Sequence, residues 1–134
     1  MIGKQTKGTS FSGCVCYVLR EDKSKLLEAV GVEGTPEQMA ELFELQTLLN
    51  AKVKNTVGHT SLNFSPEDGE RLHYDDALML QIAHDYMTKM GITDTQYIIA
   101  RHTDREHPHC HIVFNRVDND GKTISDKNDF YRNE

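Results

Sequence analysis

Two apolar runs joined by a short polar connection constrain the fold more than any other feature of this sequence. The first run predicts a strand over Gln96–His102, and Pro108 interrupts the chain before a second predicted strand over Cys110–Val117. Because only a few residues join them, the two strands are expected to pair in antiparallel fashion. Other strands alternate with helices along the chain. The sequence therefore predicts an α+β fold with a central, mainly antiparallel sheet and helices packed on one face.

Local signals place further elements around this hairpin. Lys4–Ser12 is rich in Gly, Ser and Thr and predicts a loop, whereas Ser12–Leu19 is apolar but too short to be assigned to a helix or a strand. The remaining expectations are strands over Lys25–Val32 and Lys54–Phe64, helices from the cap Thr35 to about Asn50 and over Tyr74–Met90, a turn at Asp118–Gly121 and a returning strand over Lys122–Ser125. With 134 residues, the chain fits one domain over residues 1–134. Its last residues resemble the start of further structure, so we expect the domain to continue in a longer protein.

Cysteine content and hydropathy indicate in which cellular compartment the protein is expected. The three cysteines, an odd number, are Cys14, Cys16 and Cys110, and a Cys-x-Cys pair is poorly spaced for a disulfide, which favours a reducing environment. The first residues lack the apolar run of a signal peptide, and no stretch approaches the roughly 20 apolar residues of a membrane span. We therefore expect a cytoplasmic protein without membrane partners.

Four histidines lie within the ten residues from His102 to His111. His109 and His111 are two residues apart on a strand and point the same way, and the tight connection brings His102 alongside them. Three imidazoles that converge in this way predict an open, catalytic type of metal site, suited to Mn²⁺, Zn²⁺, Co²⁺ or Ni²⁺. His107 falls on the opposite side by alternation. Asp104 and Glu106 are candidates to orient a histidine or to serve as a fourth ligand.

The run His-x-Asp-x-x-His-Pro-His-x-His-x-x-x-Asn resembles the third motif of plasmid relaxases, the MobA-like mobilisation nucleases of the HUH endonuclease class. Segment 58–68, Gly-His-Thr-Ser-Leu-Asn-Phe-Ser-Pro-Glu-Asp, resembles their second motif, in which a His and a Ser near a strand contact DNA. Segment 10–19, Ser-Phe-Ser-Gly-Cys-Val-Cys-Tyr-Val-Leu, resembles their first motif, which supplies a nucleophilic tyrosine. The three segments follow the family's order and span nearly the whole chain.

The resemblance implies a site- and strand-specific DNA nickase that starts conjugative transfer. Tyr17 would be the nucleophile, because it is the tyrosine in the first motif, and a phenol can both attack a phosphodiester and leave again. A divalent metal (Mn²⁺, Mg²⁺ or Zn²⁺) would sit on the three histidines. His59 and Ser61 would lie beside the DNA backbone or the nucleophile, or else form the polar face of a strand. Asn115 and Arg116 would contact DNA, although ordinary solvated charge explains Arg116 equally well.

The implied partners are single-stranded DNA at an origin of transfer and other proteins of the relaxosome. The net charge of −6 opposes this reading, because surfaces that bind phosphate are usually basic. The acidic residues cluster in Glu28–Glu44 and Glu67–Asp85, which could face away from DNA. Two alternatives stay open: a metal-stabilised DNA-binding module that does not cleave, and an HUH replication initiator with Tyr131 as nucleophile. A third would be a metallohydrolase of small phosphodiesters, with no role for Tyr17.

Overall fold

Five strands and three helices make up the described part of the chain. The structure is a computed structural model that describes residues 2–20, 23–65, 67, 75–102 and 108–125. The strands are β1 (Ile2–Gly8), β2 (Ser24–Val30), β3 (Val57–Asn63), β4 (Tyr97–His102) and β5 (His109–Asn115). The helices are α1 (Phe11–Val18), α2 (Pro36–Thr47) and α4 (Asp76–Lys89).

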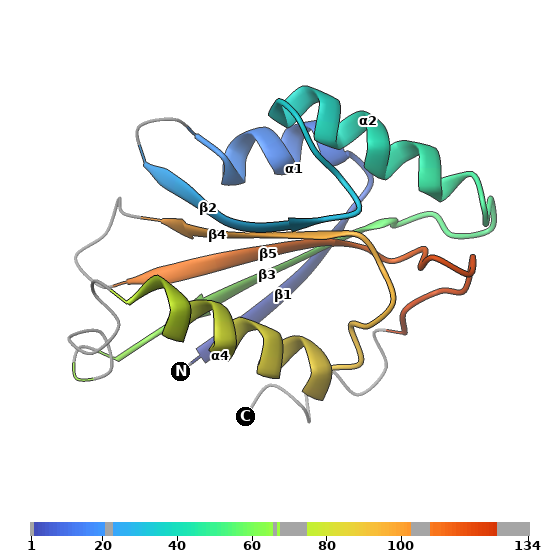
Figure 1. Cartoon of the computed structure of the whole chain (residues 1–134). Coiled ribbons are helices and arrows are strands. Elements are labelled where there is room, and N and C mark those ends of the chain that lie inside the picture. The colour runs from blue at the N-terminus through green and yellow to red at the C-terminus, as the bar shows by residue number, and fades with distance from the viewer. Residues whose placement is uncertain (1, 21–22, 66, 68–74, 103–107, 126–134) are drawn as a thin grey trace.

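The strands form one sheet with the order β1-β3-β5-β4-β2, and every neighbouring pair is antiparallel (Figure 1). The predicted hairpin is confirmed, because β4 pairs with β5 and His102 lies opposite His109. All seven residues of β5 are buried, as expected for a central strand that is covered on both faces. The antiparallel α+β class is therefore confirmed.

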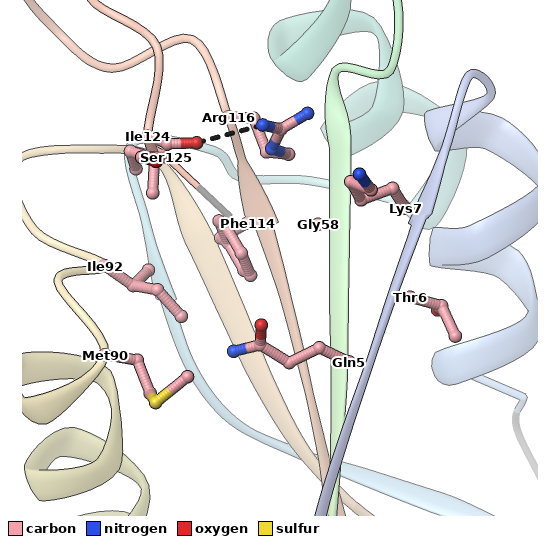
Figure 2. Close-up of a pocket in the computed structure, with 10 residues that line it drawn as sticks. All are labelled: Gln5, Thr6, Lys7, Gly58, Met90, Ile92, Phe114, Arg116, Ile124 and Ser125. Carbon is pink, nitrogen blue, oxygen red and sulfur yellow. Dashed lines mark hydrogen bonds between the residues drawn. The ribbon is translucent and has the colours of Figure 1, made fainter. Parts of the chain in front are cut away.

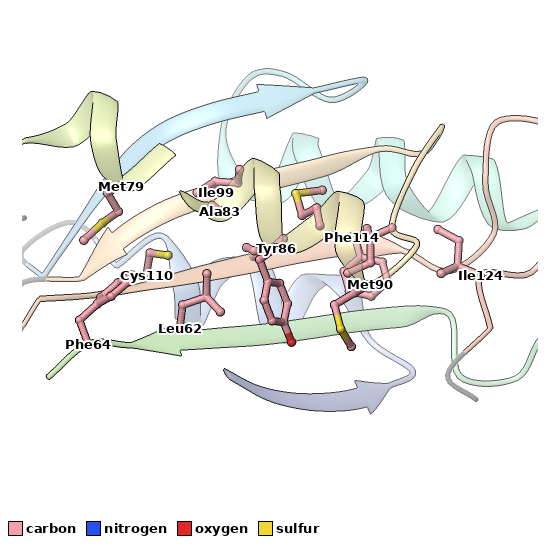
Figure 3. Close-up of a cluster of buried hydrophobic side chains, with 13 residues drawn as sticks. Leu62, Phe64, Met79, Ala83, Tyr86, Met90, Ile99, Cys110, Phe114 and Ile124 are labelled. Atoms are coloured by element: carbon pink, nitrogen blue, oxygen red, sulfur yellow. The ribbon is translucent and has the colours of Figure 1, made fainter. Parts of the chain in front are cut away.

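The helices cover both faces of this sheet, which corrects the expectation of one face. Helices α1 and α2 lie on one side and α4 on the other (Figure 1). Apolar residues that are neighbours in sequence divide between two cores, one on each face of the sheet. Ile98 and Val113 pack with α1 and α2, whereas Ile112 packs with α4. Figure 3 shows the core on the α4 side, which also contains Ile99. Strands with continuous apolar runs need a cover on each face, because successive side chains point to opposite sides.

Segment Lys4–Ser12, predicted as a loop, is mostly strand β1. Its backbone pairs with β3 over the whole strand, from Ile2 opposite Asn63 to Gly8 opposite Val57. It lies at an edge of the sheet, where polar and Gly residues are tolerated, so composition gave the wrong assignment. The undecided segment Ser12–Leu19 is a helix with Ser10 as its N-cap, and the expected returning strand Lys122–Ser125 is reduced to one bridge, Val117 to Thr123.

Helix ends follow the local chemistry. Thr35 and Gln38 form the predicted capping box at the start of α2, and Gly91 follows α4 with a positive φ of 77°. The helix expected to reach about Asn50 ends at Thr47. Among the described helices, none is both long and apolar enough to cross a bilayer.

Gly58 of β3 leaves room for the ring of Phe114 on the neighbouring strand. A Cβ atom at residue 58 would lie 2.2 Å from Cζ of Phe114, and the two residues line one small pocket (Figure 2).

Because Phe114 belongs to the α4 core, Gly58→Ala is expected to lower the free energy of unfolding by about 1–3 kcal/mol through overpacking. Urea denaturation measures this. Gly8→Ala is the matched control, since its Cβ would meet only Val57 Cβ at 3.8 Å; an equal loss in both variants would contradict the packing argument.

Candidate metal centre

Three histidines meet where β4 and β5 pair. His102, His109 and His111 are 1%, 3% and 6% exposed, and each offers a ring nitrogen within 4.8 Å of the other two. The ring centroids of His102 and His111 are 4.0 Å apart, and His109 lies 5.3 Å from each. The strand register explains this cluster, because His102 is opposite His109 and His111 lies two residues further along β5 on the same face. The predicted three-histidine cluster is confirmed.

A hydrogen bond to the first helix sets the ring of His102. Its Nε2 lies 2.7 Å from the carbonyl oxygen of Val18, in the last turn of α1. Since a carbonyl can only accept, Nε2 donates, and a neutral imidazole then carries its lone pair on Nδ1. Histidines that bind metals commonly direct their second nitrogen to a backbone carbonyl in this way. The residues present therefore fit a divalent metal ion, and the same bond fixes the end of α1 against the cluster.

His59 of β3 adds a fourth ring to the cluster. Nε2 of His59 lies 2.7 Å from Nδ1 of His111. Because this contact occupies Nδ1 of His111, that histidine would hold a metal through its own Nε2. Burial lowers the pKa of His59 below its ordinary value, and repulsion from His102 lowers it further. A neutral His59 can accept the Nδ1 proton of His111, which fixes the tautomer of that ligand. The second-motif histidine thus contacts a candidate ligand directly.

Loss of His59 is expected to weaken metal binding without removing it. His59→Ala deletes the partner of His111 Nδ1, and loss of such a partner typically costs about 10- to 100-fold in metal affinity. His59→Gln should recover part of this loss, because its amide oxygen can accept the same proton. Titration of Mn²⁺ or Zn²⁺ followed by calorimetry measures both variants. Unchanged affinity in His59→Ala would show that this contact does not orient His111.

Tyr17 lies beside the cluster, on the last turn of α1. Its ring centroid is 6.1 Å from those of His102 and His111 and 6.5 Å from that of His59. Phe11, Val15 and Val18 form the buried stripe of α1, so Tyr17 lies at the edge of that stripe and is 47% exposed. This combination places an accessible phenol next to the two buried imidazoles of His102 and His111 and the partly buried imidazole of His59.

Sequence reasoning missed two neighbours of these residues. The guanidinium of Arg20 lies over the ring of Tyr17, with 4.9 Å between its Cζ atom and the ring centroid. Asn63 lies opposite His109 on β3 and donates from Nδ2 to Oγ of Ser61 at 3.3 Å. Arg20 follows the C-cap Leu19 of α1, so only its closeness to Tyr17 in the sequence was an available signal for the first contact.

Ser61 lies near the cluster, whereas Asn115 does not. Ser61 is opposite His111 in the register of β3 and β5 and is partly exposed. Asn115 is fully buried: its Nδ2 donates to Phe43 O and Gln96 Oε1, and its Oδ1 accepts from Val117 N. A side chain enclosed in this way joins β5 to α2, so the assignment of Asn115 to DNA is corrected.

Arg116 and Asp104 are the remaining residues that the sequence predicted for the site. Arg116 donates to the carbonyl oxygens of Asn55 and Ile124 and lines the pocket that contains Phe114, on the α4 side of the sheet (Figure 2). It is therefore remote from the histidine face, on which Tyr17 lies. Asp104, Glu106 and His107 lie outside the described residues.

One protein family matches most of this chain. Residues 17–134 match the family described as "Relaxase: MobA/VirD2-like, nuclease domain". Neither the curated proteins nor the solved structures contain a match. The matched range includes Tyr17 and all the histidines of the cluster.

Proposed function

We propose that this chain, which belongs to the MobA/VirD2-like relaxase nuclease family, nicks one DNA strand at an origin of transfer with Tyr17 as nucleophile. The observation that carries the proposal is the position of Tyr17, whose ring lies 6.1 Å from the rings of two of the three clustered histidines. Family membership supports DNA cleavage in transfer as the activity, and the phenol supplies a nucleophile at the candidate metal centre.

The step exchanges one phosphodiester for another. The phenol oxygen of Tyr17 forms a bond to phosphorus, the bond from phosphorus to the 3′ oxygen breaks, and the phenol proton ends on that oxygen as a free 3′ hydroxyl. The products are a 5′-phosphotyrosyl link and a DNA 3′ end, so no water or oxidant is consumed. Because the bond that breaks is replaced by a similar one, the reaction is reversible and the strand can be rejoined after transfer.

His102, His109 and His111 would hold the divalent ion, which would offset the charge that develops on the non-bridging oxygens of the scissile phosphate. His59 keeps the ring of His111 in place through its 2.7 Å contact. Nitrogen donors favour Mn²⁺ or Zn²⁺ over Mg²⁺. Asp104 is proposed to orient a histidine or to add a ligand.

The DNA is proposed to enter single-stranded over the exposed side of Tyr17. Arg20 supplies positive charge directly over the tyrosine ring, and His59 and Ser61 line the same face of the sheet. Arg116 would reach DNA only if the strand passed around to the pocket on the α4 side. Other proteins of the relaxosome are the further partners that the family implies.

A gel assay tests this function. The protein, Mn²⁺ and a single-stranded oligonucleotide that carries the origin of transfer are expected to give an adduct that survives SDS. Its phosphodiesterase-trimmed peptide should carry one nucleotide on tyrosine through a 5′ phosphate. Binding of metal and oligonucleotide without any adduct would favour the non-cleaving module instead.

A further inference from the structure

Helix α2 presents an apolar and acidic surface that the nicking reaction does not use. Two hollows, of about 480 and 500 Å³, adjoin the helix, and Glu41 and Leu45 line both of them. We call this the α2 surface and define it by Glu33, Glu37, Glu41, Glu44, Leu45 and Leu48. In Figure 1, α2 is the outermost element on its face of the sheet.

The leucines on this surface are unusually exposed. Leu45 is 61% and Leu48 76% exposed, whereas Met39, Ala40 and Phe43 already provide the buried face of the same helix. The core therefore does not require apolar side chains at residues 45 and 48. Adjacent exposed leucines beside a hollow are typical of surfaces that bind an apolar side chain from another molecule.

The charges around the leucines restrict what can bind. Four carboxylates line the hollows, and none of the described residues that line them is Lys or Arg. This excess of negative charge repels DNA phosphates, and it would also repel the same surface of a second copy in a symmetric dimer. A partner with apolar anchors flanked by positive charge complements both the exposed leucines and the carboxylates of the surface.

We propose that the α2 surface docks a basic amphipathic helix of a partner protein. Leu or Met anchors at helical spacing would enter the two hollows around Leu45, while Lys or Arg beside them would pair with Glu37 and Glu41. Ser12, in the first turn of α1, lines one hollow, while Tyr17 is in the last turn of that helix. The hollow and Tyr17 therefore adjoin different turns of α1.

Fluorescence anisotropy with designed peptides tests the proposal on the whole chain. The probe is a labelled helix of about 18 residues with Leu at positions i, i+4, i+7 and i+11 and Lys beside them. Its matched control carries Glu in place of each Lys. We expect the Lys peptide to bind at least about tenfold more tightly than the Glu peptide, with a difference that shrinks as salt is raised.

Variants of the protein locate the binding. Leu45→Ser with Leu48→Ser, and separately Glu37→Gln with Glu41→Gln, are each expected to weaken binding about tenfold or more. Leu26→Ser is the matched control, since Leu26 is a 40% exposed leucine on β2. No binding of the Lys peptide, equal binding of both peptides, or an effect of Leu26→Ser as large as that of the leucine pair would each overturn the proposal. So would a concentration-dependent dimer that the leucine pair variant abolishes.

Discussion

Tyr17→Phe is expected to abolish the SDS-stable DNA adduct, with a loss of at least about a thousandfold in the rate of its formation. The substitution removes one oxygen and leaves the ring that lies beside His59, His102 and His111 and beneath Arg20. Because Tyr17 is half-exposed, its hydroxyl contributes little to the core, and the melting temperature should stay unchanged. A radiolabelled oligonucleotide followed on denaturing gels measures the rate.

Two other tyrosines make this prediction specific. Tyr97 of β4 donates its hydroxyl to Glu28 on the α4 side of the sheet. Burial, together with this contact, raises the pKa of Tyr97 to about 12. Tyr97→Phe should therefore leave adduct formation intact. Tyr131→Phe tests the replication-initiator alternative. An adduct that persists in Tyr17→Phe and disappears in Tyr131→Phe would transfer the nucleophilic role to Tyr131.

The histidine cluster was predictable because it depends on local geometry. His109 and His111 share a face by strand alternation alone, and a short connection suffices to place His102 beside them. The role of His59 was not predictable in detail, because its contact with His111 depends on the register of β3 against β5. That register joins residues about fifty positions apart, and no local pattern determines it.

Asn115 shows the limit of the alternation argument. It shares the face of His109 and His111, as expected, but it lies four residues beyond His111, or roughly 13 Å along the strand. At that distance the sheet is covered by α2, and Phe43 accepts a hydrogen bond from the amide of Asn115. Alternation determines the face of a residue but does not show which helix covers that part of the face.

The two errors about the sheet have different origins. Strand β1 was missed because an edge strand is held by backbone hydrogen bonds and needs no apolar pattern of its own. The second covered face was missed because the sequence of α4 does not show on which side of the sheet the helix packs. The apolar runs Tyr97–Ala100 and Ile112–Phe114 contained the missing information, since both successive residues of a strand need burial when helices lie on both sides.

His111→Ala is expected to remove the stabilisation of the fold by divalent metal. A metal that binds only the folded chain raises the free energy of unfolding by about 2.7 kcal/mol when its concentration is a hundred times its dissociation constant. His111 offers one of the three clustered nitrogens, and its loss should lower metal affinity by more than about a hundredfold, beyond the effect of losing the outer partner His59. Thermal melts with and without Mn²⁺ or Zn²⁺ measure the change.

The comparison within each variant separates metal binding from folding. His111 is buried, so its replacement also lowers stability without metal, but only the increment caused by added metal reports on the site. His84→Ala is the control, because His84 is a partly exposed histidine on α4 that contacts Glu28 on the other side of the sheet. It should retain the full metal-dependent increment. If His111→Ala retained the increment and His84→Ala lost it, the stabilising metal would bind away from the cluster, and the proposed catalytic role of the three histidines would fail with it.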